Sequence, residues 1–407
     1  MLKKTLYELE TNHVRRSVMK KALMYFIMVV LSCMLVVPGS TFGAEGKVGK
    51  VIKVIDKSNV DEVADLLPVT IVKQVKELGL KFNWVEGDYN YQPPQAYRDA
   101  TEKFKGQAKV DSEGNLTNYT AGLPFPDPKT GLEVMWNFDS RYTGDDHVYK
   151  GSVGKMRDKK GRWRSMTMDF NLIRFTGRTS LPPVYDIPTD DKIKRKTLSF
   201  MTKPQAVAGT GVLAYVYEDP NRENDLWFYV PTLRRIVRAS AARGSENYGG
   251  TDTTWDDIYV WSGRIQEANY KLLGKKEVLA LVDEGLNETP DDSGGFLQGG
   301  NYQKVPVYEI EAVHKDPKYP YSKSIWWVDP ATWEILYSVI YDRKGNLWKS
   351  IQQRFYHNDQ GVHFAHNMPF NDYQTEHFTN WIISDYTDNN NPAPNFFTLE
   401  TLRQLGQ

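Results

Sequence analysis

Short runs of alternating apolar and polar residues fill most of the chain from about residue 149 to the C-terminus. In SMTMDFNL, residues 165–172, the methionine, phenylalanine and leucine side chains fall on one face of an extended chain and the polar side chains on the other. The same alternation of apolar and polar residues occurs in the runs GVLAYVYED, DLWFYVP, VPVYEIEAVH and WEILYSVIYD. Turn sequences such as VDPAT and DRKGN separate neighbouring runs without room for a helix, so the pattern predicts antiparallel strands.

Residues 45–145 have a different pattern of apolar and polar residues, which predicts mostly helical and irregular structure. DEVADLLPVTIVKQVKELGL has apolar residues at helical spacing, and PQAYRDATEKF places a proline at a helix start. Within the strand region, TTWDDIYVWSG and TLETLRQL are expected to be helical interruptions. The sequence therefore predicts an α+β fold, in which a helical and irregular N-terminal extension (45–145) packs on an antiparallel sheet domain (146–407).

The predicted strands form one large, strongly curved antiparallel sheet with a few helices on one side. More large apolar side chains face one way than a thin core requires. A sheet that curls around a cavity explains them, and so does an ordinary core covered by the N-terminal helices. The alternation alone leaves both interpretations open.

The N-terminus has the order of regions that is typical of a secretory signal peptide. From Met19 the chain reads two lysines, an apolar run and then small residues, and that run is short for a membrane span. We interpret residues 1–44 as a signal peptide with Met19 as the start of translation, because the residues before Met19 do not match the pattern of a signal peptide. The expected location is the periplasm. The single cysteine, Cys33, lies within the apolar run, where simple cleavage is favoured over acylation or an uncleaved membrane anchor.

Composition narrows the function. The 51 basic and 51 acidic side chains balance, whereas a nucleic-acid-binding protein carries a basic excess. Aromatic residues make up 13% of the chain, which is common in extracytoplasmic β-rich proteins and in proteins that hold greasy or sugar-like ligands.

Signatures of catalysis are missing from the sequence. It contains no Gly-x-Ser-x-Gly elbow, no phosphate-binding loop and no dinucleotide fingerprint. His363 and His366 are three residues apart, so in a strand they point to opposite faces and make a poor metal chelate; surface histidines are the expected alternative. Adjacent carboxylates such as Asp145 and Asp146 have no evident catalytic partner. We therefore predict no catalytic residue, metal or cofactor.

The stretch NDLWFYVPTLRRIVRAS is expected to be a hairpin that turns at Pro231. Its arginines alternate between the two faces of the second strand, which argues against one flat basic patch for nucleic acid. They are predicted to pair with the carboxylates of TDTTWDDI and hold that segment against the sheet, although contact with a ligand stays open. This clamp consists of Arg234, Arg235, Arg238, Asp252, Asp256 and Asp257.

The same stretch, followed by YGGTDTTWDDI, resembles the hairpin and following segment of lipoprotein-carrier-like (LolA/LolB-like) proteins, and in particular the periplasmic DUF1329 family. AGLPFPDP, VMWNF, YKLLGKKE and WWVDPATWEILYSVIYDRKGNLWK are further matches. Thr251-Asp252 stands where the family usually has Ser-Asp. The resemblance implies a half-barrel of antiparallel strands with helices covering its concave side and an apolar cavity inside. It also implies association with RND/MMPL-type exporters and an outer-membrane partner.

These observations favour a periplasmic, non-enzymatic carrier of a lipid or other hydrophobic molecule, with a helical lid that competes with the cargo. A structural or adaptor subunit with a packed interior is the first alternative, and a cell-envelope hydrolase is the second. The sequence leaves open the identity of the cargo. The predicted lining of the cavity is Met166, Met168, Phe170, Leu172, Leu226, Phe228 and Val230.

Overall fold

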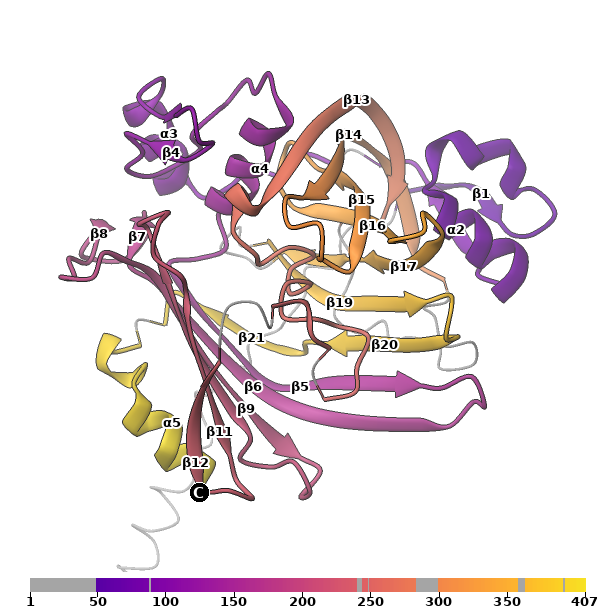
Figure 1. The fold of residues 1–407 in the computed structure, drawn as a ribbon. Coiled ribbons are helices and arrows are strands. Elements are labelled where there is room, and N and C mark those ends of the chain that lie inside the picture. The colour runs from indigo at the N-terminus through magenta and orange to yellow at the C-terminus, as the bar shows by residue number, and fades with distance from the viewer. Residues whose placement is uncertain are drawn as a thin grey trace, which may run out of the picture. The chain divides into compact units, whose positions relative to one another are not determined.

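The long antiparallel sheet predicted from the alternation is the main feature of the computed structural model (Figure 1). The structure describes residues 49–87, 89–239, 244–247, 249–282, 299–357, 363–390 and 392–407. The predicted signal peptide and Cys33 lie outside these residues. All described elements belong to the unit Glu45–Gln407, so the predicted division at residue 145 stays a prediction.

Six strands form one half of the sheet, and each is antiparallel to its neighbours. In spatial order they are β12 (Arg235–Ala239), β11 (Asp225–Val230), β10 (Gly211–Tyr217), β9 (Ile193–Lys203), β6 (Trp163–Arg174) and β5 (Asp146–Arg157).

The second half continues from β5, which pairs with both β20 and β21. In spatial order its strands are β20 (His377–Ile382) with β21 (Asp385–Asp388), β19 (His363–Asp372), β17 (Leu347–Gln352) with β18 (Arg354–His357), β16 (Ile335–Asp342), β15 (Tyr321–Val328), β14 (Asn301–His314) and β13 (Ala268–Ala280). β14 also makes a short parallel pairing with β2 (Phe82–Val85), which pairs in turn with β1 (Val51–Ile55).

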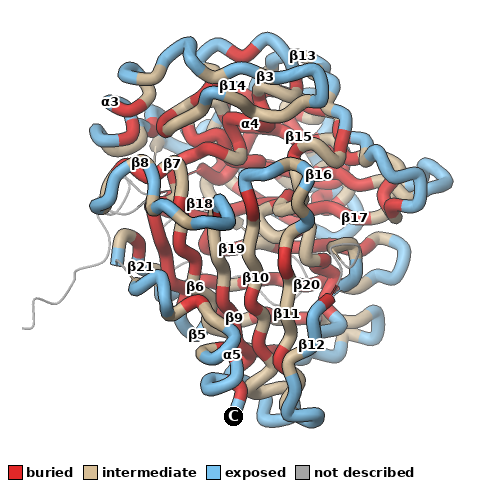
Figure 2. The backbone as a smooth tube through the Cα atoms, turned by 60° about the vertical axis from the view of Figure 1, so that its left-hand side comes forward, coloured by how far each residue is buried: buried red, intermediate tan, exposed pale blue. Residues whose placement is uncertain are grey.

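The remaining elements are short. They are the helical turns η1 (Val60–Leu66), α2 (Val69–Lys73) and η2 (Gln74–Leu78), helices α3 (Gln95–Phe104), α4 (Gly131–Ser140) and α5 (Leu399–Gly406), the hairpins β3 (Lys109–Val110) with β4 (Leu116–Thr117) and β7 (Thr176–Arg178) with β8 (Tyr185–Asp186), and the turns η4 (Ile265–Glu267) and η5 (Pro394–Phe396). Buried positions follow the strands, and exposed positions gather in the connecting turns (Figure 2).

Cross-strand pairing defines the two faces of the sheet. Phe170, Ser199 and Val212 lie opposite one another on successive strands, and we call their side of the sheet the inner face. Helix α4 packs on the inner side, in a core with Ile310 and Trp326. Its start is fixed by a capping box, in which the side chains of Thr130 and Glu133 each bind the other's backbone N–H.

Helices also cover the outer face. α5 packs there against Leu198, Leu213 and Tyr229, and Figure 1 shows it on the opposite side of these strands from the segment that joins β12 to β13. The contact is close, because a Cβ at Gly406 would lie 2.2 Å from the ring of Tyr229. The predicted C-terminal helix and the α+β class with a curved antiparallel sheet are therefore confirmed, while the helices lie on both faces rather than on one.

Candidate functional site

A segment that becomes buried from residue 251 crosses the inner face of the sheet between β12 and β13. We call residues 244–247 and 249–267 the inner segment. Its TDTT sequence, residues 251–254, is at most 4% exposed at each position. Sequence analysis predicted a helix over TTWDDIYVWSG, but these residues form turns and bends instead. The correction has a physical reason, since the side chains here bind the sheet and not the next turn of a helix.

Strand β20 holds the start of the inner segment. Asp252 Oδ2 accepts a hydrogen bond from Thr379 Oγ1 at 2.7 Å and lies 2.6 Å from His377 Nδ1. Trp381 Nε1 donates to Thr253 Oγ1 at 3.0 Å. The hydrogen bond with Asp252 raises the pKa of His377, because the carboxylate favours the protonated imidazole.

Strands β15 and β17 hold the same segment from the other side. Tyr321 donates its hydroxyl to Asp257 Oδ2 at 2.8 Å. Lys349, which is 1% exposed, donates to the backbone carbonyl of Asp252 at 2.9 Å. A lysine is rarely buried so completely without a specific partner, so these contacts fix the inner segment firmly to the sheet.

The turn that follows is conformationally unusual. Tyr259 and Val260 both have positive φ, 56° and 71°. A β-branched residue in this region is uncommon and costs roughly 1–3 kcal/mol, so the surrounding contacts must impose it. Tyr259 is held by hydrogen bonds of 2.8 Å to His147 and 3.1 Å to Tyr149 on β5.

The predicted arginine clamp is not the device that holds this segment. Arg234, Arg235 and Arg238 are exposed on and beside β12. The side chain of Arg238 binds Asp225 on the neighbouring strand, and Arg234 occupies the turn with a φ of 50°. The carboxylates of Asp252 and Asp257 are buried and satisfied by the hydroxyl and imidazole groups of the sheet, and Asp256 accepts from Tyr319 at 3.0 Å. The inner segment is bound to the sheet, but the partners of its carboxylates are side chains of the sheet and not these arginines.

A cavity of about 770 Å³ lies between the inner face of β6, β9, β10 and β11 and the inner segment. Four of the predicted lining residues, Met168, Phe170, Leu172 and Leu226, line it. Three did not meet this expectation. Met166 packs in the core beside Gly249, Phe228 contacts Trp255 at a ring distance of 5.3 Å, and Val230 lies at the end of its strand opposite Arg235.

Residues that sequence reasoning missed complete the apolar wall. Val212, Ala214 and Val216 come from β10, whose alternation in GVLAYVY was a usable signal. Trp255 and Ile258 come from the inner segment and close the opposite side. The sequence offered no signal for their position, because it depends on where the segment crosses the sheet.

One end of the cavity is polar. Arg141, Arg174 and Arg195 line it together with Asp139 and His147. Burial, with a contribution from Arg174, lowers the pKa of His147 to about 3, so its imidazole is neutral at physiological pH. The mouth is marked by exposed lining residues, among them Glu223, Lys315 and Lys318.

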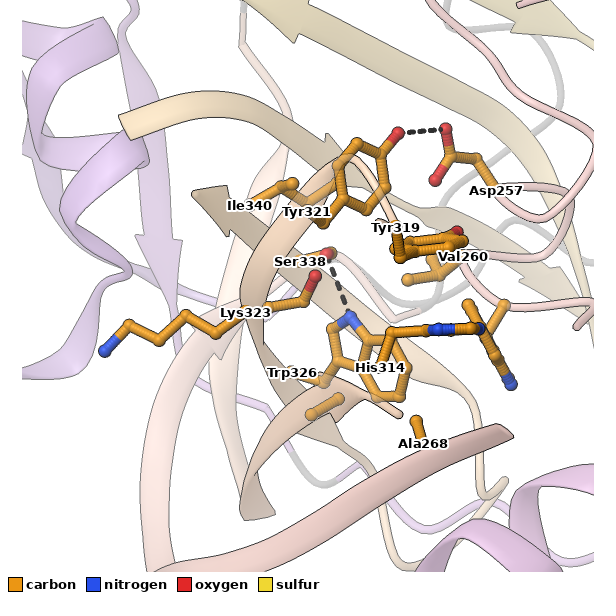
Figure 3. Close-up of a pocket in the computed structure, with 13 residues that line it drawn as sticks. Asp257, Val260, Ala268, His314, Tyr319, Tyr321, Lys323, Trp326, Ser338 and Ile340 are labelled. Atoms are coloured by element: carbon orange, nitrogen blue, oxygen red, sulfur yellow. Dashed lines mark hydrogen bonds between the residues drawn. The ribbon is translucent and has the colours of Figure 1, made fainter. Parts of the chain in front are cut away.

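A second pocket, lined by Asp257, Tyr321 and Trp326, has a volume of about 20 Å³, which is room for roughly one water molecule. Figure 3 shows the hydrogen bonds at its wall, from Trp326 to Ser338 and from Tyr321 to Asp257. This pocket is too small for an organic ligand, so the larger cavity is the candidate site.

The described residues contain no group of three or more His, Cys, Asp or Glu side chains placed to bind a metal ion. His363 and His366 are both 2% exposed, so the expectation of surface histidines was wrong. In the part of the chain that the structure describes, no helix has the length and hydrophobicity needed to cross a membrane.

The carboxyl group of Asp256 provides a test of the inner segment. Burial, reinforced by Asp257 and Glu267, raises its pKa from an ordinary 3.8 to about 7. The folded state therefore binds a proton that the unfolded state has lost, and stability falls as the pH rises from about 4 to about 7. We expect the stability of Asp256→Asn to gain about 2–3 kcal/mol relative to the unmodified protein between pH 5 and pH 8. Urea unfolding at both pH values measures this, and an unchanged difference would contradict the burial of this carboxyl group.

Comparison with known proteins places the chain in a family. A crystal structure of a candidate outer membrane lipoprotein-sorting protein domain from Vibrio parahaemolyticus matches with a TM-score of 0.50 and 20% identity, and covers 67% of this chain and 98% of that one. A DUF1329 family protein from Desulfovibrio piger matches with a TM-score of 0.51 and 20% identity, covering 67% and 97%. These likenesses concern the fold.

In sequence, the chain is 26% identical over 277 residues to the uncharacterized protein PA3922 of Pseudomonas aeruginosa. The match covers 63% of this chain and spans 58% of that relative's length. The sequence profile of the family described as "protein of unknown function (DUF1329)" matches residues 54–403. Sequence and fold thus agree with the resemblance found in the motifs, and the chain belongs to the DUF1329 family.

Proposed function

We propose that this protein is a periplasmic, non-enzymatic carrier or chaperone for a lipid or other hydrophobic molecule. The observation that carries the proposal is the cavity of about 770 Å³, whose wall on the sheet side is built by Met168, Phe170, Leu172 and the valines of β10. Its volume lies within the range of roughly 300–1,000 Å³ that is usual for ligand sites.

The physical role follows from the cost of moving apolar surface through water. Exposed apolar area costs roughly 25 cal/mol per Å², so a lipid in transit needs a sheltered lining. Met168 suits a variable chain, because methionine is flexible and polarizable. The cavity argues against the alternative of an adaptor with a packed interior.

The periplasmic location rests on the predicted signal peptide and on the outer membrane lipoprotein-sorting domain to which the fold is similar. Cooperation with an RND/MMPL-type exporter and an outer-membrane partner belongs to the same proposal and rests on the resemblance to the family. The hydrolase alternative receives no support from the described residues, where the carboxylates of the inner segment bind the sheet.

Native mass spectrometry after gentle extraction tests the carrier function directly. We expect the purified protein to retain an amphiphile, or to take one up from detergent-dispersed lipid, with a stoichiometry near one. A protein that neither retains nor takes up any amphiphile would overturn the proposal.

Filling the cavity should abolish uptake without unfolding the protein. Ala214 lies on the inner face between Thr197 and Leu226 and lines the cavity. We expect Ala214→Trp to weaken binding of the neutral fluorophore phenylnaphthylamine by at least about tenfold, because the indole occupies the ligand's volume. The matched control is Ala206→Trp at an exposed position outside the lining. Equal binding by both variants would show that the ligand lies elsewhere.

A further inference from the structure

The inner face of β6 changes character along its length. Met168, Phe170, Leu172 and Arg174 follow one another at two-residue steps, and all four line the cavity. The span from the first to the last is roughly 20 Å at the rise of a strand. One strand therefore presents an apolar track that ends in a cation.

The neighbouring strand carries a second cation at the paired position. Arg174 on β6 lies directly opposite Arg195 on β9, and both line the cavity. Like charges at opposed positions of two strands destabilise a sheet. The repulsion between the two arginines therefore lowers the stability of the empty protein. A bound anion would remove this repulsion and restore the lost stability.

The carboxylates nearby do not neutralise this pair. Asp139 lies 3.5 Å from Arg195 Nη1 and is also bound by Lys194. These two cations hold the pKa of Asp139 at about 2 although burial alone would raise it. Asp139 is therefore ionised, and its single charge is shared between two cations.

Arg141, the third arginine of this end, is already neutralised. Its Nε lies 2.7 Å from Glu334 Oε1. Four cations, Arg141, Arg174, Arg195 and Lys194, thus face two carboxylates, Asp139 and Glu334, and two positive charges are left over.

Arg174 has the most unused binding capacity. Its guanidinium donates one hydrogen bond, from Nη2 to Thr143 Oγ1 at 3.2 Å, and its buried Nε has no partner among the described residues. No carboxylate of the described chain lies within ion-pair distance of it. A buried donor without an acceptor is costly, and a guanidinium matches the oxygens of a carboxylate or phosphate well.

We propose that the cavity selects an anionic amphiphile, whose carboxylate or phosphate head group binds Arg174 and Arg195 while its apolar tail lies along Leu172, Phe170 and Met168. This inference rests on the proposed carrier function and specifies the chemistry of its cargo. The other acidic lining residues have their own surroundings: Asp225 binds Arg238, and Asp256 accepts from Tyr319. Glu223 and Asp316 are exposed, and Glu267 lies 4.0 Å from His314.

The test compares ligands that share a tail and differ in charge. Palmitate and hexadecanol are titrated against protein loaded with phenylnaphthylamine, which is neutral and reports on the apolar wall. We expect palmitate to bind about tenfold more tightly than hexadecanol, the size of one charge-assisted hydrogen bond. Inorganic phosphate alone is the third arm, and it is expected to leave the fluorophore bound and to compete with palmitate only weakly.

Variants assign the difference to the arginines. Arg174→Gln with Arg195→Gln should reduce palmitate affinity by about tenfold and leave hexadecanol unchanged. Lys159→Gln removes an exposed cation outside the cavity lining and should change the affinity for neither ligand. Arg174→Lys keeps the positive charge and is the variant to use if the double variant does not fold. It should retain most of the preference for palmitate over hexadecanol.

The outcomes distinguish failure of the anionic head-group site from failure of the proposed carrier function. Equal binding of palmitate and hexadecanol would overturn the head-group site and leave the carrier function standing. Failure of both ligands and of the fluorophore to bind would overturn both. Phosphate that displaces palmitate at similar concentrations would show a site for a free anion and contradict the amphiphile.

Discussion

Replacing Arg141 by methionine is expected to lower the free energy of unfolding by about 3–5 kcal/mol, because Glu334 is then buried without its cation. The side chains of this ion pair are 6% and 5% exposed. Arg141 Nη1 also donates to the carbonyl of Phe138 at 2.7 Å and so closes the C-terminus of α4. The substitution removes both contacts at once.

The double variant Arg141→Met with Glu334→Leu separates charge from packing. Removing both charges avoids the uncompensated carboxylate, so it should be markedly more stable than the single variant. Urea unfolding of the two variants and the unmodified protein gives the coupling energy. A single variant that loses less than about 1 kcal/mol would mean that Glu334 escapes burial or finds another partner.

The strands were predictable because their alternation is local. SMTMDFNL and GVLAYVY fix which side chains share a face, and Met168, Phe170, Leu172 and Leu226 accordingly line the cavity. The limit of this reasoning is the end of a strand. Val230 has the right parity, but it lies where the hairpin turns and the cavity no longer reaches.

Partners distant in sequence were not predictable from pattern alone. The inner segment looked helical, since TTWDDIYVWSG spaces its apolar residues suitably, yet tertiary hydrogen bonds from Tyr321 and Trp381 determine its conformation. The arginine clamp failed for a related reason. Proximity in sequence suggested the pairing of RRIVRAS with TDTTWDDI, whereas the chain carries the carboxylates inward and leaves the arginines in water.

The polar end of the cavity illustrates the same limit. Arg174 and Arg195 stand in strands whose alternation is clear, so their parity with Leu172 and Thr197 can be derived from the sequence. Their opposition across the sheet depends on the register of β6 and β9, which alternation alone leaves undetermined. Only the paired strands bring the two cations to the same end of one cavity.

The contact that matters most for the inner segment is the carboxylate of Asp252. Asp252→Ala is expected to cost about 3–5 kcal/mol, because it removes the acceptor for the buried hydroxyl of Thr379 and the charged partner of the partly buried His377. The released segment would no longer hold Trp255 and Ile258 against the cavity. We therefore expect binding of phenylnaphthylamine to fall together with stability.

Thermal unfolding, fluorophore titration and limited proteolysis measure these effects together, and cleavage is expected within residues 244–267. The matched control is Asp191→Ala, which breaks an exposed ion pair of 2.8 Å with Arg222 and should cost less than about 1 kcal/mol. Asp252→Asn keeps one acceptor oxygen and should fall between the two. If Asp252→Ala loses stability but retains full fluorophore binding, the inner segment is a support for the sheet and not a wall of the cavity. Loss of both properties in proportion ties the integrity of the ligand site to this one buried carboxylate.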